Sequence, residues 1–159
     1  MKKWLLGLLG VAFFVNVEAV ETVEQKTITL AGAIKAAQAA QRACQGKGYA
    51  VAVVDRSGQL LALLRDEQAG PHTIDSSWRK AYTALTLRHP THKLVERVVK
   101  DPKIQALGDM NEKILLLGGG LPIVEAREVV GAIGVGGAPG AMLDVACARA
   151  GLRVLRGRD

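Results

Sequence analysis

The chain has 159 residues, of which 49% are hydrophobic, 23% are charged and 4% are aromatic, and its formal net charge is +6. This length suits one domain and leaves no room for a second sizeable hydrophobic core. The high apolar content and the presence of only two cysteines exclude a disordered chain, a collagen-like chain and a disulfide-dense scaffold. Because charges of both signs are interspersed along the sequence, the positive balance indicates a solvated surface, and we expect no nucleic-acid partner.

The first 19 residues have the layout of a secretory signal peptide. Two lysines precede an apolar run over residues 4–15, and the segment ends at Ala19. This run is shorter than the about 20 residues that a membrane-spanning helix needs, although a permanent N-terminal anchor is the alternative interpretation. We therefore expect cleavage after Ala19, a periplasmic or secreted mature protein, and no stable membrane anchor after cleavage. Loss of Lys2, Lys3 and Glu18 would change the net charge from +6 to +5.

The mature chain is expected to begin with an extension over residues 20–28, followed by one domain over residues 29–159. Thr29 is a suitable N-cap for an alanine-rich helix from Leu30 to about Gln45, which Gly46 would end.

Two short apolar runs, 49–55 and 59–65, flank the turn Arg56-Ser57-Gly58 and predict a β-hairpin. Nearly every position in both runs is apolar, so both faces of this sheet are expected to be covered.

A second helix is expected over about residues 73–87, with a buried stripe at helical spacing. The stripe consists of Ile74, Trp78, Ala81, Tyr82 and Leu85. Pro90 would end this helix, and residues 91–100 predict another helical segment. Asp101-Pro102 is typical of the start of a further short helix, with the aspartate as cap.

Three more strands are expected near the C-terminus, over residues 114–117, 121–125 and 128–135. The last two would form a hairpin around residues 125–128, and a glycine-rich turn over residues 136–140 would open a final helix, 141–150. Hairpins join most of these strands. The order of elements therefore predicts an α+β domain with a mixed or antiparallel sheet and helices packed against it.

Three histidines are candidate ligands. His89 and His92 have the spacing of a helical pair, but Pro90 lies between them, so they are interpreted as ordinary loop or surface residues. His72 follows Gly70-Pro71 at the start of a helix, beside a loop and above the stripe that contains Trp78. It could present a ring nitrogen to a ligand or metal, and an exposed histidine at a helix start is the alternative.

The glycine-rich turn after residue 133 superficially resembles a dinucleotide-binding loop. It lacks the fingerprint because Pro139 occupies the position of the third glycine, and too few residues follow to complete a dinucleotide-binding unit. The glycines either bring backbone amides close to an anion at a helix N-terminus or simply form a tight turn. Glu125 and Glu128 could hold a hard cation, but a solvated hairpin tip is the better interpretation.

The two cysteines, Cys44 and Cys147, lie on the first and last predicted helices. In an oxidising compartment they could form a disulfide, and two buried free thiols are the alternative.

Several segments together resemble the GlcG/HbpS family of haem-binding or haem-degrading proteins, over about residues 29–155. They are the stretch from Ala31 to Arg65, the helix end WRKAYTALTLRHPT and the glycine-rich stretch from Gly118 to Leu152. The most specific matches are Lys80-Ala81 with Thr83-Ala84, Pro90-Thr91, Gly119-Gly120-Leu121-Pro122, and Val130-Gly131-Ala132-Ile133-Gly134. The resemblance implies an α/β/α sandwich-like domain around a five-stranded, mainly antiparallel sheet that assembles as a homo-oligomer.

On this basis the leading hypothesis is an exported haem-binding protein for haem capture, storage or sensing, or for haem degradation. Haem needs an apolar slot, an axial donor to its iron and cations for its propionates. His72 is the candidate iron ligand beside Trp78. The other candidate contacts are Arg79, Lys80 and Arg88, together with the amides near Gly119, Gly120, Gly136 and Gly137.

Two other function classes remain open from the sequence. One is an enzyme or binding protein for a small carboxylated metabolite, and the other is a non-catalytic accessory module. The sequence does not distinguish the physiological ligand, catalytic turnover or the oligomer number.

Overall fold

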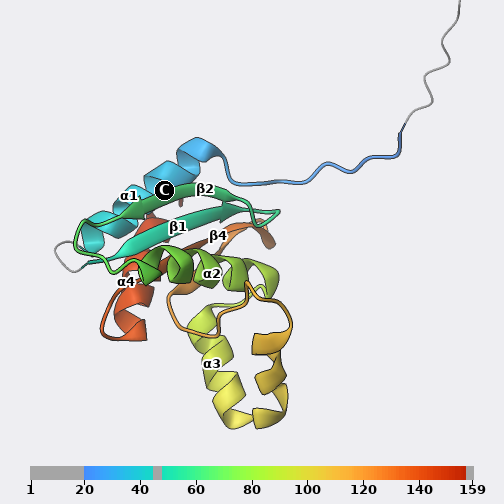
Figure 1. Ribbon diagram of the computed structural model, residues 1–159. Helices are drawn as coiled ribbons and strands as arrows, with labels where there is room; N and C mark the ends of the chain where they lie inside the picture. Colours follow the sequence, from blue (N-terminus) through green and yellow to red (C-terminus); the bar gives the residue numbers. More distant parts are fainter. Residues whose placement is uncertain (1–19, 45–47, 157–159) are drawn as a thin grey trace, which may run out of the picture.

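Figure 1 shows the computed structural model, which describes residues 20–44 and 48–156. The expected signal peptide lies outside the described residues, so its cleavage stays a prediction. None of the helices within the described ranges is long and apolar enough to cross a bilayer. The elements in chain order are α1 (Leu30–Ala43), β1 (Ala50–Asp55), β2 (Leu60–Arg65), α2 (His72–Thr86), α3 (Thr91–Lys100), the 3-10 helix η1 (Pro102–Asp109), β3 (Gly120–Glu125), β4 (Glu128–Gly136) and α4 (Ala141–Arg153).

The sheet is antiparallel and has four strands in the described part of the chain, in the order β2-β1-β4-β3. The five-stranded sheet that the sequence predicts is therefore wrong, because residues 114–117 do not form a strand. The backbone of this segment is bonded to side chains of α2 instead. The Leu115 N–H donates to Thr83 Oγ1 at 2.8 Å, and the Ile114 carbonyl accepts from Arg79 Nη2 at 2.9 Å.

Helices cover both faces of the sheet, with α1 and α4 on one face and α2 on the other (Figure 1). The first face is filled by branched side chains from the sheet and alanines from the helices, including Val51, Val53, Ile133 and Val135 against Ala36 and Ala148. The domain is therefore an α/β/α sandwich, as the family resemblance implies.

Where β4 passes under α2, the sheet is lined by very small residues. Along β4, Ala132, Gly134 and Gly136 alternate with the large residues that point to the other face. A Cβ added at Gly134 would collide with the Ser77 carbonyl oxygen and would lie 2.5 Å from the Ala81 amide nitrogen. The missing side chains let the backbone of α2 approach the sheet closely.

This close approach corrects the buried stripe predicted for α2. Ala81 and Leu85 are buried as expected, but Ile74 is 40% exposed, and Trp78 and Tyr82 are only half-buried. No space is left for aromatic rings between α2 and the glycines of β4. The two rings lie near Lys113, whose Nζ is 5.8 Å from the Trp78 ring centroid and 5.6 Å from that of Tyr82.

Several local predictions are confirmed. The Gly32 N–H donates to Thr29 Oγ1 at 3.1 Å, so Thr29 caps α1, and Asp101 caps η1 through the Lys103 N–H. The first hairpin is also present, but its two strands differ. β1 is buried almost throughout, whereas β2 is a half-exposed edge strand in which Leu60 is 46% exposed, so the expectation that both faces are covered is wrong for β2.

Cys44, which follows α1, is joined to Cys147 of α4 by a disulfide, with 5.7 Å between the two Cα atoms. Both cysteines belong to the core cluster beneath the two helices. Of the two alternatives that the sequence leaves open, the structure therefore has the disulfide.

Candidate functional site

The site residues predicted from the sequence do not lie together. His72 is exposed at the start of α2, with its ring against Gly70, and it lines none of the hollows described below. Trp78 and Arg79 lie under the segment that contains Lys113, and Arg79 is bonded to the Ile114 carbonyl. Arg88 lies at the other end of α2. The structure does not bring these residues into one pocket, and their ligand-binding roles stay predictions.

Lys80 is the most deeply buried of the predicted cations, with 2% of its surface exposed. Its ammonium donates to Asp144 Oδ2 at 2.7 Å and to the Val135 carbonyl at 3.1 Å. Burial raises the pKa of the Asp144 carboxyl, and the hydrogen bond from Lys80 opposes this rise. Asp144 also accepts from the Ala138 N–H at 3.1 Å, so the pair ties α2 to the glycine-rich turn before α4.

The predicted glycines are packed around this ion pair and the neighbouring backbone. A Cβ at Gly119 would lie 2.9 Å from Asp144 Cβ, and one at Gly136 would lie 2.7 Å from Ser76 Oγ. The Gly120 N–H already donates to Thr91 Oγ1 at 2.9 Å. Gly137 has a φ of +130°, and a Cβ there would collide with the Gly48 carbonyl. These glycines are therefore required by the close packing of the fold.

A different cluster of cations surrounds a hollow between α3, β3 and α4, which we call the basic pocket. Its volume is about 500 Å³. It is lined by Pro90, His92, Lys93, Leu121, Pro122, Arg149, Leu152, Arg153 and Arg156. Arg149 and Arg153 are one helical turn apart on α4, and Arg156 follows just beyond the helix. Within the described residues, no carboxylate forms an ion pair with these three arginines. The basic pocket therefore favours an anionic group.

His92 lies in the wall of the basic pocket and is only 8% exposed. Its Nδ1 is buried and has no hydrogen-bond partner among the described residues. Burial lowers the pKa of the imidazole, and the positive charges of Lys93 and Arg149 lower it further. The ring is therefore neutral at pH 7, which is the form that coordinates metals. The sequence-based interpretation of His92 as a surface residue is wrong, because α3 places the ring against the body of the domain.

An apolar groove adjoins the basic pocket. It has a volume of about 540 Å³ and shares Pro122, Leu152 and Arg156 with the basic pocket. Its other apolar lining residues come from the segment before α1, from β3 and β4 and from the C-terminal turn: Ile28, Ile123, Val124, Val130 and Leu155. An apolar surface therefore continues into a cluster of cations, an arrangement suited to a flat apolar molecule that carries carboxylates.

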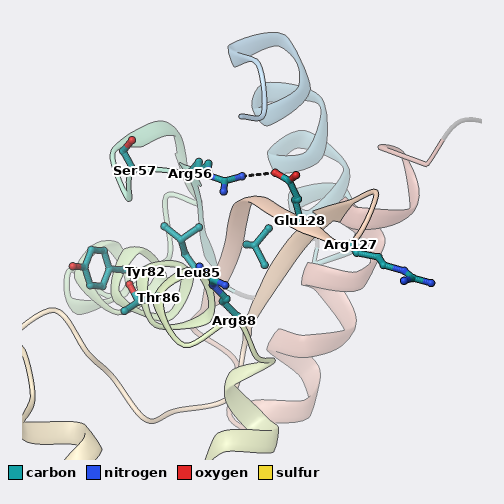
Figure 2. A pocket seen from close by; sticks show the side chains of 9 residues that line it. Arg56, Ser57, Tyr82, Leu85, Thr86, Arg88, Arg127 and Glu128 are labelled. Atoms are coloured by element: carbon teal, nitrogen blue, oxygen red, sulfur yellow. Dashed lines mark hydrogen bonds and ion pairs between the residues drawn. The ribbon is translucent and has the colours of Figure 1, made fainter. Parts of the chain in front are cut away.

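A third hollow, the arginine pocket, has a volume of about 310 Å³ and is shown in Figure 2. It lies between the turn after β1, the end of α2 and the β3–β4 hairpin. Its lining residues are Arg56, Ser57, Tyr82, Leu85, Thr86, Arg88, Arg127, Glu128 and Val129. Glu128 forms an ion pair with Arg56 at 2.8 Å. Among the residues that the structure describes, no group of three or more acidic, histidine or cysteine side chains could hold a metal ion.

One feature of the sequence could have indicated the basic pocket. Arginines at positions 149, 153 and 156 follow helical spacing and fall on one side of the last helix. The burial of His92 had no such signal, since it depends on how α3 packs against segments far away in the sequence.

Comparison with known proteins gives one family match. A family model described as haem degrading protein HbpS-like matches residues 28–153. A 15.0 kDa protein from the dhaT-dhaS intergenic region of Citrobacter freundii is 39% identical over 114 residues, which are 70% of this chain and 80% of that protein.

Solved structures share the fold. A double mutant of Streptomyces reticuli HbpS is 40% identical, with a TM-score of 0.81, over 94% of this chain and 100% of that one. Klebsiella pneumoniae ORFY is 29% identical, with a TM-score of 0.81, over 90% of this chain and 100% of that one. PduOC in complex with heme is 21% identical, with a TM-score of 0.75, over 82% of this chain and 96% of that one, a likeness that shows the fold alone.

Proposed function

Because the chain belongs to the HbpS-like haem degrading protein family, we propose that it binds haem across the apolar groove and the basic pocket. The observation that carries this proposal is the junction of the two hollows at Pro122, Leu152 and Arg156. A porphyrin needs apolar walls, its propionates need cations, and its iron needs a donor atom. The two hollows together offer all three.

Each part of the haem has matching side chains in this site. Leu121 and Pro122 of β3 and Leu152 of α4 would contact the ring. Arg149, Arg153 and Arg156 would neutralise the propionates through charge-assisted hydrogen bonds. His92 would supply the axial nitrogen, because its ring is neutral and it lines the basic pocket. Bound haem supplies an iron centre whose behaviour is set by its axial donor and by the polarity around it.

PduOC, which shares this fold, was solved as a complex with heme. His72 remains a second candidate ligand from the sequence, but it lies outside the three hollows. Its role is therefore best tested beside that of His92.

We also propose that the protein works outside the cytoplasm. Two features support this: the signal-like sequence of residues 1–19 and the disulfide between Cys44 and Cys147, a bond that persists in oxidising compartments.

We propose in addition that the protein forms a homo-oligomer. The half-exposed edge strand β2, together with exposed apolar residues such as Val99 of α3 and Met110 at the end of η1, supports further association.

Haem titration monitored by the Soret band tests the function, with His92→Ala and His72→Ala as a matched pair. We expect saturable binding by the wild-type chain, a changed Soret position and weaker binding for His92→Ala, and unchanged spectra for His72→Ala. Arg153→Gln should weaken binding without moving the Soret band. Absence of a saturable shift in the wild type would contradict haem binding. Loss of the shift only in His72→Ala would identify His72, and not His92, as the iron ligand.

A further inference from the structure

Three residues other than glycine have left-handed backbone conformations among the described residues. They are Arg88 with φ 54°, Ala126 with φ 48° and Arg127 with φ 69°. Side chains with a Cβ rarely adopt this region, and glycine enters it without steric cost. Two of the three are arginines, and both of these arginines line the arginine pocket.

Neither position needs an arginine for its local geometry. Arg88 directly follows the C-cap of α2, at the position where helices commonly end on a glycine. Ala126 and Arg127 form the two-residue turn between β3 and β4, where positive φ at both residues is typical of a type I′ turn and favours Asn-Gly. What each arginine adds is a flexible guanidinium side chain on a residue that lines the same hollow.

A third guanidinium is already fixed in this pocket. Arg56 Nη1 bonds to Glu128 Oε2 at 2.8 Å, and the Arg56 backbone N–H donates to Thr27 Oγ1 at 3.1 Å. The pocket is therefore lined by three cations and one carboxylate. In this contact, one nitrogen of the Arg56 guanidinium donates to a carboxylate oxygen.

Figure 2 shows how the arginines are arranged. Arg56 and Arg88 lie on opposite sides of Leu85, and the side chain of Arg127 extends away from the pocket. Rotation of side-chain torsions can bring Arg127 towards a ligand while the turn keeps its backbone conformation. Ser57, Tyr82 and Thr86 also line the pocket.

We propose that the arginine pocket binds a small ligand with two negative charges on oxygen, either a dicarboxylate or a phosphate group. Two net positive charges among the lining residues match such a dianion, and guanidinium groups bind both kinds of oxyanion with paired hydrogen bonds. A volume of about 310 Å³ suits a small molecule. The pocket shares no lining residue with the proposed haem site, so this inference does not depend on haem binding.

Isothermal titration of the oxidised full chain with succinate and with inorganic phosphate, against sodium chloride at matched ionic strength, tests the proposal. The variants are Arg88→Gly and Arg127→Gly, with Ala126→Gly as the matched control, because it relaxes the same turn without removing a guanidinium. We expect saturable binding of at least one dianion by the wild type. Each arginine variant should lose at least fivefold in affinity while gaining thermal stability, and Ala126→Gly should gain stability and keep its affinity within twofold.

The gain in stability ensures that lost binding cannot be attributed to unfolding. The tighter of the two probes identifies the ligand as a dicarboxylate or a phosphate compound. The proposal is overturned if neither probe binds saturably, if both arginine variants bind as the wild type does, or if Ala126→Gly loses as much affinity as they do.

Discussion

Replacing Lys80 by methionine should test whether the buried ion pair with Asp144 holds the fold together. Both side chains are 3% exposed, and their charged atoms are 2.7 Å apart. Methionine retains most of the length of the lysine side chain but leaves the Asp144 carboxylate buried, with the Ala138 N–H as its remaining partner. Breaking a buried pair by removing one partner typically costs about 3–5 kcal/mol, so we expect a loss of about 3 kcal/mol or more in the free energy of unfolding at pH 7.

The pH dependence of this loss provides a second readout. Burial already raises the pKa of Asp144, and the variant removes the hydrogen bond that opposes this rise. The folded variant therefore binds a proton at a pH where the unfolded chain, with an ordinary pKa of 3.8, does not. Between these two pKa values the folded state holds more protons, so its stability increases as the pH falls. The difference in free energy of unfolding between wild type and Lys80→Met should thus become smaller as the pH is lowered from 7 towards 4.

Urea unfolding of both chains under oxidising conditions, at several pH values between 4 and 7, measures the effect. The double variant Lys80→Met, Asp144→Asn serves as the control, because the amide oxygen can still accept from Ala138 and no charge is left buried. It should recover part of the loss at pH 7 and show no extra stability at low pH. A loss below about 1 kcal/mol, or a deficit that does not change with pH, would refute this account of the pair.

Three further predictions concern the packing of α2 on β4, the disulfide and the basic pocket. Gly134→Ala should cost several kcal/mol in chemical unfolding, because its Cβ would collide with the Ser77 carbonyl, whereas Gly140→Ala, with nothing within 4 Å, should be nearly neutral. Reduction of the disulfide, which links residues 103 positions apart, should lower stability by about 4–5 kcal/mol by the loop-entropy relation, and thiol alkylation before and after reduction would detect a chain in which the bond is absent. The pKa of His92 is lowered in the folded state, so as the pH falls below the ordinary value of 6.5 the unfolded state binds more protons than the folded state. The haem-free protein should therefore lose stability below pH 6.5, and the variant His92→Gln should lack this part of the pH dependence.

The sequence predicts the parts of the fold that depend on neighbouring residues. The cap at Thr29, the hairpin around residues 56–58 and the start of η1 at Asp101 all follow from local hydrogen bonding and turn chemistry, and all are confirmed. The family resemblance is confirmed by the match over residues 28–153.

The predictions that are wrong depend on distant partners. Residues 114–117 have the composition of a strand, but their backbone groups bond to Thr83 and Arg79 of α2. Trp78 and Tyr82 follow helical spacing, yet the glycines of β4 leave no room for them beneath the helix. His92 is buried by contacts that its own neighbours in the sequence do not reveal. Local sequence patterns predict the helices and strands, whereas the packing of one helix or strand on another determines which residues form a pocket.

The two faces of the sheet differ in how much sequence change they can absorb. Under α1 and α4, valines, isoleucines and alanines fill the space, and such cores accept substitutions that conserve volume at a modest cost. Under α2 the separation between helix and strand is set by side chains that are absent from Gly134 and Gly136, so every substitution at these two glycines adds volume. The layer under α1 and α4 can therefore tolerate sequence change that the glycines of β4 cannot. A library intended to alter its ligand preference should randomise the hollows and the α1–α4 layer, and should leave the seam between α2 and β4 unchanged.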